Sequence, residues 1–396
     1  MHARYDLPVH DSANLDELLR ASPVRVVFGP GALAQLGTLC RELRAQRVLL
    51  VSDPGIVAAG HVARAMQYLE AEGIRIAVFD GAHENPTTEH VAAGLDTARQ
   101  AEPDLIVGLG GGSAMDCAKG VNLLLTNGGQ MSDYRGDPPA DVLARRKPLL
   151  PMLLIPTTAG TGSEAQSFAL ISDAATNRKM ACGDRRLPRE GGLRPHVAIL
   201  DPDLLVTQPR EIAAHAGIDA LAHAVETAGS TRRNERSRAL SCAAWRALSG
   251  AFPRAMADPR DRRSWAAMLA GAHLAGAAIE LSMLGAAHAC ANPLTQRFGV
   301  AHGVAVGLML PHVVRFNAAG GENPYSDLDA DAESLVGKIE ALLVAAGAPQ
   351  VLVEIGVPES ALDDLAALAA QEWTATFNPR RVGAAALREI YTAATR

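Results

Sequence analysis

The ten residues GIDALAHAVE, residues 217–226, place a carboxylate and an imidazole four residues apart among small aliphatic side chains. On a helix, Asp219 and His223 would point from one face, because residues i and i+4 are neighbours there. Such a pair can form half of a metal site. An Asp–His hydrogen bond or a buried neutral histidine is the commoner explanation of the spacing. The pair therefore gains weight only from further ligands elsewhere in the chain.

Two more histidines lie downstream, in a segment rich in small residues (284–303). His288 belongs to a helical pattern that Gly299 is expected to end, so that His288 and His302 bracket a turn and converge. One carboxylate and three imidazoles can bind Fe²⁺, Zn²⁺, Mn²⁺ or Co²⁺ with a position left open, and ligand softness does not choose among these metals. Three other histidines remain competing candidates: His215, His273 and His312.

A glycine turn in the first half of the chain has the composition of a phosphate site. The sequence GLGGGSAMDCAK, residues 108–119, follows an apolar strand and opens a helix. Glycines let backbone N–H groups approach a phosphate closely, and a helix N-terminus attracts negative charge. Ser113 stands where the usual GxGxxG pattern has its third glycine, and a tight turn without a ligand is an equal alternative.

Two further stretches favour a nucleotide at this turn. The predicted strand 47–53 ends in Asp53, whose carboxylate can accept a hydrogen bond from an adenosine ribose hydroxyl. The same charge would repel a 2′-phosphate, which favours NAD over NADP; the alternative is that Asp53 only caps a turn before Pro54. The stretch PTTAGTGSE, residues 156–164, is too polar and too flexible for a core and suits a loop around a phosphate or a ribose.

The elements that position these residues change type along the chain. In the first half, strands alternate with helices, which indicates right-handed βαβ units and a mainly parallel sheet. The expected strands are 24–29, 47–53, 74–80, 104–113, 148–158 and 196–203, and the expected helices are 61–73, 87–101 and 115–127. A polar segment, 183–196, is expected to be a loop.

After about residue 206, alanine-rich stretches with helical periodicity replace the strand signals. The expected helices there include 210–229, 237–252, 264–280 and 303–316. We therefore expect a Rossmann-like α/β dinucleotide-binding domain at 1–206, with 1–22 as a possible extension, and an all-α metal-binding domain at 207–396.

Composition narrows the class of protein. The chain has 396 residues, 48% of them hydrophobic, and a net charge of −6 without a basic stripe, so nucleic acid and anionic membranes are unlikely partners. The five cysteines form no CxxC pair, which argues against a disulfide framework or a zinc ribbon. The absence of a signal-peptide pattern and of a membrane-length apolar run leads us to expect a cytoplasmic protein.

With the nucleotide loops and the Asp/His set both in view, the chain resembles the iron-containing (group III) metal-dependent alcohol dehydrogenase family, and within it the group of lactaldehyde reductase and propanediol and butanol dehydrogenases. The resemblance implies a dehydroquinate-synthase-like fold. The motifs that carry it, besides those quoted above, are FGPG (28–31), ENPT (84–87), DYRG (133–136), Lys179 in RKM, AILDP (198–202), LPHVVRFN (310–317) and FNPR (377–380).

The resemblance also implies roles for single residues. The family's four metal ligands fall on Asp219, His223, His288 and His302. Its cofactor contacts fall on Asp53, Asn85, Gly110, Gly111, Gly112, Ser113, Asp116, Thr157, Thr158, Thr161, Ser163 and Lys179. One position departs from the pattern, because Asn292 replaces a histidine that many members carry near the nicotinamide and that is thought to relay a proton. Asparagine can hydrogen-bond a substrate or cofactor but cannot titrate.

The expected function is reversible hydride transfer between NAD(H) and a small primary alcohol, aldehyde or hydroxyaldehyde, with a divalent metal, Fe²⁺ first and Zn²⁺ or Mn²⁺ next. The alternatives are a hydroxyacid–oxoacid transhydrogenase, a metal-independent reductase of the same superfamily and a non-catalytic metal- and nucleotide-binding protein. Relatives are commonly dimers or larger, so a homo-oligomer is expected.

Overall fold

The computed structural model describes residues 12–136, 142, 144, 147–176, 178–183 and 192–396. The predicted extension, 1–22, lies partly outside these residues, and its described part forms helix α1 (Ser12–Arg20). Contacts divide the chain into two compact units. Among the described residues, the first unit holds 19–158 and 162–207, and the second holds 12–18, 159–161 and 208–396.

A six-stranded sheet forms the centre of the first unit, and all its described pairings are parallel, in the order β1-β8-β5-β4-β2-β3. The strands are β1 (Arg25–Phe28), β2 (Arg47–Val51), β3 (Arg75–Phe79), β4 (Leu105–Gly110), β5 (Met152–Pro156) and β8 (Val197–Leu200). Every residue of β4 and β5 is buried, as expected of a parallel sheet with both faces covered. The prediction of a mainly parallel sheet is confirmed.

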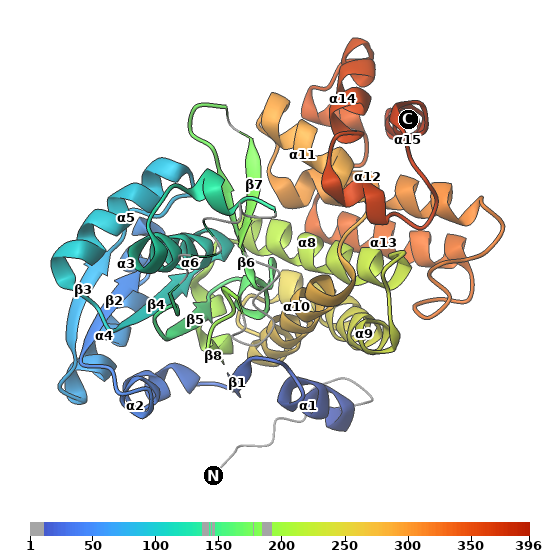
Figure 1. Cartoon of the computed structure of the whole chain (residues 1–396). Helices are drawn as coiled ribbons and strands as arrows, with labels where there is room; N and C mark the ends of the chain where they lie inside the picture. Colours follow the sequence, from blue (N-terminus) through green and yellow to red (C-terminus); the bar gives the residue numbers. More distant parts are fainter. Residues whose placement is uncertain (1–11, 137–141, 143, 145–146, 177, 184–191) are drawn as a thin grey trace. The chain divides into compact units, whose positions relative to one another are not determined.

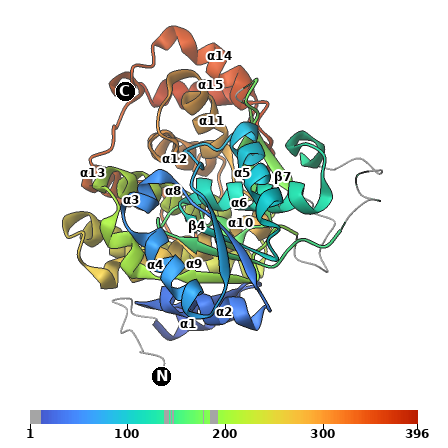
Figure 2. The same ribbon diagram turned by 90° about the vertical axis from the view of Figure 1, so that its left-hand side faces the viewer.

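Helices cover the sheet of the first unit (Figures 1 and 2). They are α2 (Leu36–Glu42), α3 (Pro54–Ala58), α4 (His61–Ala71), α5 (Thr88–Ala101) and α6 (Gly112–Asn127), with short 3₁₀ turns η1 (Ala32–Gln35), η2 (Met131–Tyr134), η3 (Ser163–Ala165) and η4 (Pro202–Thr207). Leu49 and Val51, alternate residues of β2, share one hydrophobic core with Val91 of α5 and Val121 of α6. Alternation along a strand sends every second side chain to the same face, so this face of the sheet carries α5 and α6.

A short antiparallel ladder, β6 (Phe168–Ser172) with β7 (Lys179–Gly183), was not predicted from the sequence. Of the polar segment 183–196 that was expected to be a loop, Gly183 is the last residue of β7. Residues 184–191 lie outside the described part of the chain. The ladder matters for function because β6 is tied to the loop that follows β5.

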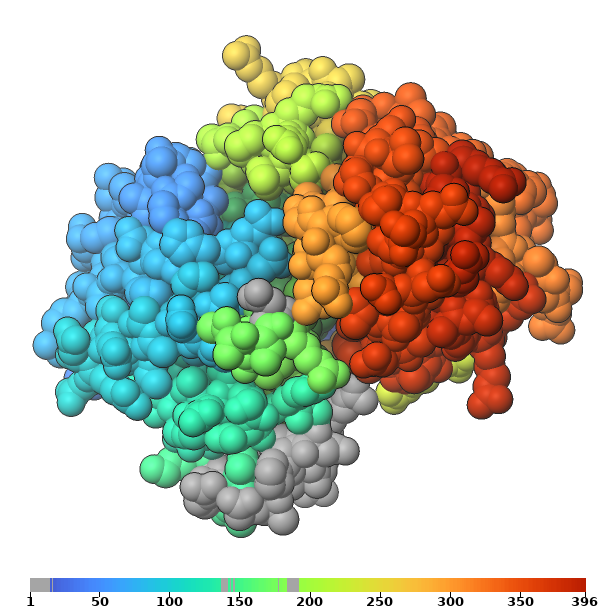
Figure 3. Space-filling view, turned by 90° about the horizontal axis from the view of Figure 1, so that it is seen from above, coloured from blue at the N-terminus to red at the C-terminus, as the bar shows by residue number. Residues whose placement is uncertain are grey.

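Helices make up the second unit. They are α8 (Arg210–Gly229), α9 (Glu235–Ala257), α10 (Arg262–Ser282), α11 (Ala286–Phe298), α12 (His302–Ala318), α13 (Ala332–Ala346), α14 (Leu362–Ala369) and α15 (Ala384–Ala393), with 3₁₀ turns η5 (Leu352–Ile355), η6 (Glu359–Ala361) and η7 (Trp373–Phe377). The four helical segments expected here are confirmed. Figure 3 shows the atoms of the last part of the chain, coloured orange to red, gathered beside one another.

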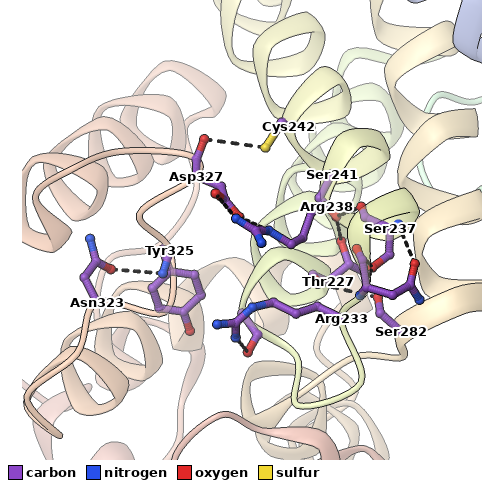
Figure 4. Close-up of polar contacts among 12 residues, drawn as sticks. Thr227, Arg233, Ser237, Arg238, Ser241, Cys242, Ser282, Asn323, Tyr325 and Asp327 are labelled. Atoms are coloured by element: carbon purple, nitrogen blue, oxygen red, sulfur yellow. Dashed lines mark hydrogen bonds and ion pairs between the residues drawn. The ribbon is translucent and has the colours of Figure 1, made fainter.

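Small and hydroxyl side chains let the helices of the second unit pack closely. A methyl group at Gly271 of α10 would lie 2.7 Å from Leu248 of α9, so the glycine is needed at this crossing. Thr227 of α8 and Ser241 of α9 share a hydrogen bond of 2.7 Å between their hydroxyls, which Figure 4 shows. These contacts fix α8, the helix that carries the sequence GIDALAHAVE.

In the described part of the chain, no single helix combines the length and apolarity that a membrane crossing requires, and only α10 and α11 taken together, bent by 106°, meet the test of length and composition.

Candidate metal centre and nucleotide-binding turn

The predicted metal ligands come together in the second unit. Asp219 and His223 lie one turn apart on α8, His288 is in the first turn of α11, and His302 is the first residue of α12. The Nε2 atoms of His223 and His288 each lie 3.3 Å from Oδ1 of Asp219, and Nε2 of His302 lies 3.9 Å from it. One carboxylate oxygen therefore faces three imidazoles.

A helix break brings the third and fourth of these side chains together, as the sequence predicts. Helix α11 ends at Gly299, whose φ of 66° is in the left-handed region that favours glycine. Helix α12 then starts at His302, so the chain reverses between the two histidines. The rings of His288 and His302 lie 5.4 Å apart between centroids.

The donor set fits a divalent first-row metal. Metal–nitrogen and metal–oxygen bonds of about 2.0–2.2 Å require neighbouring ligand atoms to be roughly 3–3.5 Å apart, close to the separations from Asp219 Oδ1. Ligand atoms of Asp219, His288 and His302 all lie within 4.8 Å of one another. In the described residues this is the only such cluster of three or more; it leaves out His223, and His215, His273 and His312 do not belong to it.

Burial and charge set the protonation of these groups. Burial alone would raise the pKa of Asp219. The facing imidazoles lower this pKa by more than burial raises it, so the carboxyl pKa lies well below its usual range. Burial lowers the pKa of His223 to about 4. Burial also lowers the pKa of His288, but the carboxylates of Glu226 and Asp219 outweigh it and raise the pKa to about 9. The carboxylate of Asp219 therefore stays ionised among the imidazoles, and the pKa values of His223 and His288 are shifted in opposite directions.

A second carboxylate beside the site was not given a role by the sequence. Glu226, on α8, is buried, and its Oε2 accepts a hydrogen bond from Nδ1 of His288. The signal was present, because Glu226 follows His223 by three residues and Asp219 by seven, which keeps all three on one helix face. What the sequence does not show is that Glu226 bonds to His288, which lies 62 residues further along the chain.

Asn292, the departure from the family pattern, lies one helical turn after His288 on α11. Its Nδ2 donates a hydrogen bond of 2.9 Å to Oε2 of Glu372. The side chain is therefore oriented by a carboxylate, with its amide oxygen left as an acceptor.

In the first unit, the glycine turn joins β4 to α6. Gly110 has a φ of 156°, and a methyl group there would lie 2.7 Å from Cβ of Ala114 and 3.0 Å from Oδ2 of Asp53. Helix α6 has Gly111 as its N-cap residue, so no side chain covers its first N–H groups. Gly112 and Ser113 form the first two residues of the helix, and Ser113 is half-buried. The turn offers the free N–H groups that a phosphate requires.

Asp53 caps a helix, which was the alternative to a ribose contact, and its second carboxylate oxygen lies beside the glycine turn. Its Oδ1 accepts a hydrogen bond of 3.0 Å from Ile56 N and caps α3, in which Pro54 is the first residue. Its Oδ2 lies beside Gly110 of the glycine turn. Burial raises the pKa of this carboxyl, while the backbone N–H groups of Ile56 and Gly55 lower it.

The loop after β5 runs alongside the glycine turn. Thr157 N donates to Gly110 O at 2.9 Å, and Oγ1 of Thr158 would lie 3.7 Å from a methyl group at Gly111. Oγ1 of Thr157 is buried and has no hydrogen-bond partner in the described residues. An unpartnered hydroxyl next to a phosphate-type turn is consistent with a bound nucleotide.

Two of the predicted cofactor contacts bond to the protein itself. Ser163 Oγ donates to Asp116 Oδ1 at 2.5 Å, and Leu170 N donates to Asp116 Oδ2 at 3.0 Å. Lys119, which is fully buried, donates from Nζ to the Ser163 carbonyl and hydroxyl and to the Phe168 carbonyl, each at 2.7 Å. This buried set ties the loop after β5, and β6 with it, to α6.

The remaining predicted cofactor residues lie in three different parts of the chain. Asn85 has a φ of 52° in the left-handed region and immediately precedes Pro86. Lys179 is the first residue of β7 and pairs with Ser172. Thr161 groups by its contacts with the second unit, together with residues 159 and 160.

Comparison with known proteins matches almost the whole chain. The model of the family "Iron-containing alcohol dehydrogenase" matches residues 23–202, and that of the "Fe-containing alcohol dehydrogenase family, C-terminal" matches residues 213–395. A 1,3-propanediol dehydrogenase of Klebsiella pneumoniae is 33% identical over 370 residues, 89% of this chain and 92% of the relative. An NAD-dependent methanol dehydrogenase of Bacillus methanolicus is 30% identical over 374 residues, 90% of this chain and 94% of the relative.

A crystal structure of a 1,3-propanediol oxidoreductase superimposes with a TM-score of 0.86. The two chains are 33% identical, and the match covers 94% of this chain and 98% of the other. Sequence and fold thus point to the same set of relatives.

Proposed function

Because the chain belongs to the iron-containing alcohol dehydrogenase family, whose members oxidise alcohols or reduce aldehydes, we propose that it transfers a hydride reversibly between NAD(H) and a small primary alcohol, aldehyde or hydroxyaldehyde. The observation that carries the proposal is the convergence of Asp219 with His223, His288 and His302 in one unit, while the other unit bears the glycine turn beside Asp53. In this proposal 1–206 is the dinucleotide-binding domain and 207–396 the metal-binding domain.

The metal would be held by Asp219 and the three imidazoles, with Fe²⁺ expected before Zn²⁺ or Mn²⁺. When bound, a divalent ion supplies Lewis acidity to the substrate oxygen. The protein's own contribution there is a buried set of ligand atoms: Asp219, His223 and His288 are each no more than 5% exposed. Burial excludes water and strengthens the interactions of the site with developing charge.

The nucleotide would be held by the turns of the first unit. The free N–H groups at the start of α6 suit a pyrophosphate. Oδ2 of Asp53, beside Gly110, would accept a hydrogen bond from a ribose hydroxyl, and its charge would disfavour a 2′-phosphate, which supports NAD over NADP. Thr157 offers its unpartnered hydroxyl. Gly110, Gly111, Gly112, Ser113, Thr158, Thr161, Asn85 and Lys179 remain predicted contacts.

Asn292 limits how a proton can leave. An amide has no group that titrates in the range of enzyme activity, so residue 292 can orient a hydroxyl but cannot accept its proton. Water or a ribose hydroxyl would then carry the proton in this enzyme.

The decisive experiment is anaerobic. Protein stripped with a chelator is reloaded with Fe²⁺, Zn²⁺ or Mn²⁺ in turn, and NADH absorbance is followed with a panel of short aldehydes and hydroxyaldehydes. The proposal predicts loss of activity on stripping and recovery with one metal, and it identifies that metal and ranks the substrates.

Other outcomes contradict the proposal in distinguishable ways. Full activity after stripping indicates a metal-independent reductase. NAD retained through purification, with turnover of a hydroxy acid and an oxo acid but no need for added NAD, indicates a transhydrogenase. Tight NADH binding without turnover of any aldehyde indicates a non-catalytic binding protein, and Asn292→His is then the first variant to make.

Assembly and location belong to the same proposal. We expect a homodimer or larger homo-oligomer in the cytoplasm. Light scattering during size-exclusion chromatography measures the assembly, and a monomeric mass would contradict it.

A further inference from the structure

The start of helix α11 is capped by side chains from two other elements. The helix begins after Gly285, which has no side chain to satisfy the first backbone N–H groups. Ala286 N instead donates to Oδ1 of Asn378 at 3.2 Å, and Ala287 N donates to Oε1 of Glu226 at 2.7 Å. The next residue along this clamped turn is His288.

Glu226 acts on both the backbone and the ring of this turn. While Oε1 accepts from Ala287 N, Oε2 accepts from Nδ1 of His288. A carboxylate only accepts hydrogen bonds, so the proton lies on Nδ1, and Nε2 is directed towards Asp219 Oδ1, 3.3 Å away. One buried side chain thus fixes the orientation of the imidazole and the peptide that precedes it.

Asn378 is itself held in one orientation by a buried amide pair. Its Nδ2 donates to Asn317 Oδ1 at 2.7 Å and to Arg380 O at 2.6 Å, and its Oδ1 accepts from Asn317 Nδ2 at 3.1 Å. Asn317 Nδ2 also donates to the hydroxyl of Tyr325 at 2.7 Å, a residue labelled in Figure 4. With both N–H groups of Asn378 in use, its oxygen must face Ala286 N.

Gly285 leaves room for both caps. A methyl group at this position would lie 3.1 Å from Oδ1 of Asn378 and 3.1 Å from Oε1 of Glu226. Both oxygens belong to buried side chains whose other bonds allow little movement. The glycine and the two caps therefore act as one arrangement.

We propose that Glu226, Asn378 and Asn317 are positioning residues for the metal centre: they clamp the first turn of α11 so that His288 presents Nε2 beside Asp219. The inference rests on the proposed function, in which His288 is a metal ligand. It gives a role to Glu226. It also gives a role to Asn317, the last residue of LPHVVRFN (310–317), and to Asn378, the second residue of FNPR (377–380). Outer partners of metal-bound histidines typically change metal affinity by 10–100-fold.

A purely structural network would predict something different. Its loss would lower the stability of the second unit, and metal affinity would fall only in proportion to the loss of folded protein. A positioning network predicts that isosteric replacement changes metal affinity while the fold is retained.

The test compares three variants with a matched control. Glu226→Gln keeps an oxygen for Ala287 N but places an NH₂ group opposite Nδ1 of His288. Asn378→Ala removes the cap on Ala286 N, and Gly285→Ala crowds both caps. Ser264→Ala is the control, because its buried hydroxyl bonds to Asp261 at the start of α10 and not to α8 or α11.

The measurements are Co²⁺ affinity by competition with a chromophoric chelator, the visible spectrum of bound Co²⁺, and thermal unfolding of metal-stripped protein. For Glu226→Gln and Gly285→Ala we expect Co²⁺ affinity to fall 10–100-fold, with an altered spectrum, in stripped protein that still unfolds cooperatively. Ser264→Ala should lower the unfolding midpoint of stripped protein and leave the Co²⁺ affinity and spectrum unchanged. If Asn378→Ala does not fold, Glu226→Gln decides the question.

Equal Co²⁺ affinity and spectrum in Glu226→Gln and the wild type would overturn the inference while leaving the proposed function intact. A wild type that binds no Co²⁺ through Asp219 would overturn both.

Discussion

At the scale of single residues, Asp219 is the proposed ligand on which we expect metal binding to depend most. Its Oδ1 is within 3.9 Å of Nε2 of each of the three histidines, and it is the one carboxylate in the cluster of ligand atoms that the described residues form. We expect Asp219→Asn to lower metal affinity by at least about 100-fold, more than the loss of an outer partner, and to reduce turnover to background. Metal content after dialysis and NADH consumption measure the two effects.

The control is Asp363→Asn, an exposed carboxylate of the same unit that pairs with Arg388. An Asp219→Asn protein that retained stoichiometric metal would remove Asp219 from the ligand set.

Lys119 is the second residue with a sharp prediction. Its ammonium is fully buried and bonds Ser163 and Phe168, beside the Asp116 carboxylate at 3.4 Å. Removing one partner of a buried ion pair costs about 3–5 kcal/mol, so Lys119→Met should lower the free energy of unfolding in urea by this amount. NADH affinity should fall as well, because the loop after β5 loses its anchor.

The double variant Lys119→Met/Asp116→Leu separates the two effects. It leaves no unpaired buried charge and should regain much of the stability, but NADH affinity, measured by fluorescence titration, should stay low. Wild-type NADH affinity in the double variant would show that the anchor does not act on the nucleotide.

These residues also show what the sequence could and could not predict about the site. The i, i+4 spacing of Asp219 and His223 and the glycine after α11 were visible, because both are local patterns. Asp116 and Ser163 were predicted to contact the cofactor, yet they bond to each other across 47 residues of chain. A pairing of that separation has no local signal, and the same holds for Asn378 and Ala286, 92 residues apart.

At the scale of helices and strands, the close approach of α12 to α8 depends on Gly303. A methyl group at this residue would overlap the backbone carbonyl oxygen of His215, so α12 would have to move. His302, its neighbour, would then move away from Asp219. We expect Gly303→Ala to cost about 1–3 kcal/mol of stability and to weaken metal binding about tenfold or more.

Gly337 provides the comparison, since it lies in α13 and a methyl group added there would have nothing within 4 Å. Gly337→Ala should raise stability by about 0.5–1 kcal/mol and leave metal binding unchanged. A Gly303→Ala protein with wild-type unfolding and metal affinity would contradict the predicted overlap.

An ion pair ties the segment between α12 and α13 to α9. Arg238 donates from Nε and Nη2 to the two oxygens of Asp327, each at 2.6 Å, as Figure 4 shows. These bonds lower the pKa of Asp327. Since the folded-state pKa is depressed, the pair stabilises the fold above the unfolded-state pKa of about 3.9, and this contribution disappears as pH falls through the lower folded-state pKa.

Thermal unfolding of the wild type and of Asp327→Asn should therefore differ by a small, constant amount from pH 7 to about pH 5, and the difference should shrink below about pH 4. The exposed pair is screened by salt, so the difference in thermal unfolding between the two proteins should also become smaller at high ionic strength. A difference in thermal unfolding that grew as the pH fell would contradict the predicted loss of stabilisation at low pH.

The elements themselves were predicted well where their pattern was long. The helix expected at 210–229 has those bounds in the structure, because small residues sustain helical periodicity over 20 residues. The ladder of β6 and β7 was missed although its strands are as long as β2, β3 and β5, because β7 (KMACG) has no β-branched or aromatic residue to mark it as a strand. Thr87 caps α5 by accepting a hydrogen bond from His90 N.

At the scale of the whole molecule, the division into two units makes the two ligands separable. The proposed metal ligands lie in the second unit, and all predicted nucleotide contacts except Thr161 lie in the first. A ligand at 100 times its Kd stabilises the folded protein by about 2.7 kcal/mol, and local openings that break its contacts should slow by up to about 100-fold.

We therefore expect hydrogen exchange to respond in two places. Loading stripped protein with Fe²⁺ should slow exchange in α8 and in the first turns of α11 and α12, whereas NADH should slow exchange at the start of α6 and in the loop after β5. The Asp219→Asn variant should lose only the first response, because the residues predicted to bind the nucleotide are unchanged. If that variant lost both responses, NADH binding would depend on the metal centre and the two ligands would be coupled; if the wild type showed no response to Fe²⁺ in α8, the metal would bind elsewhere.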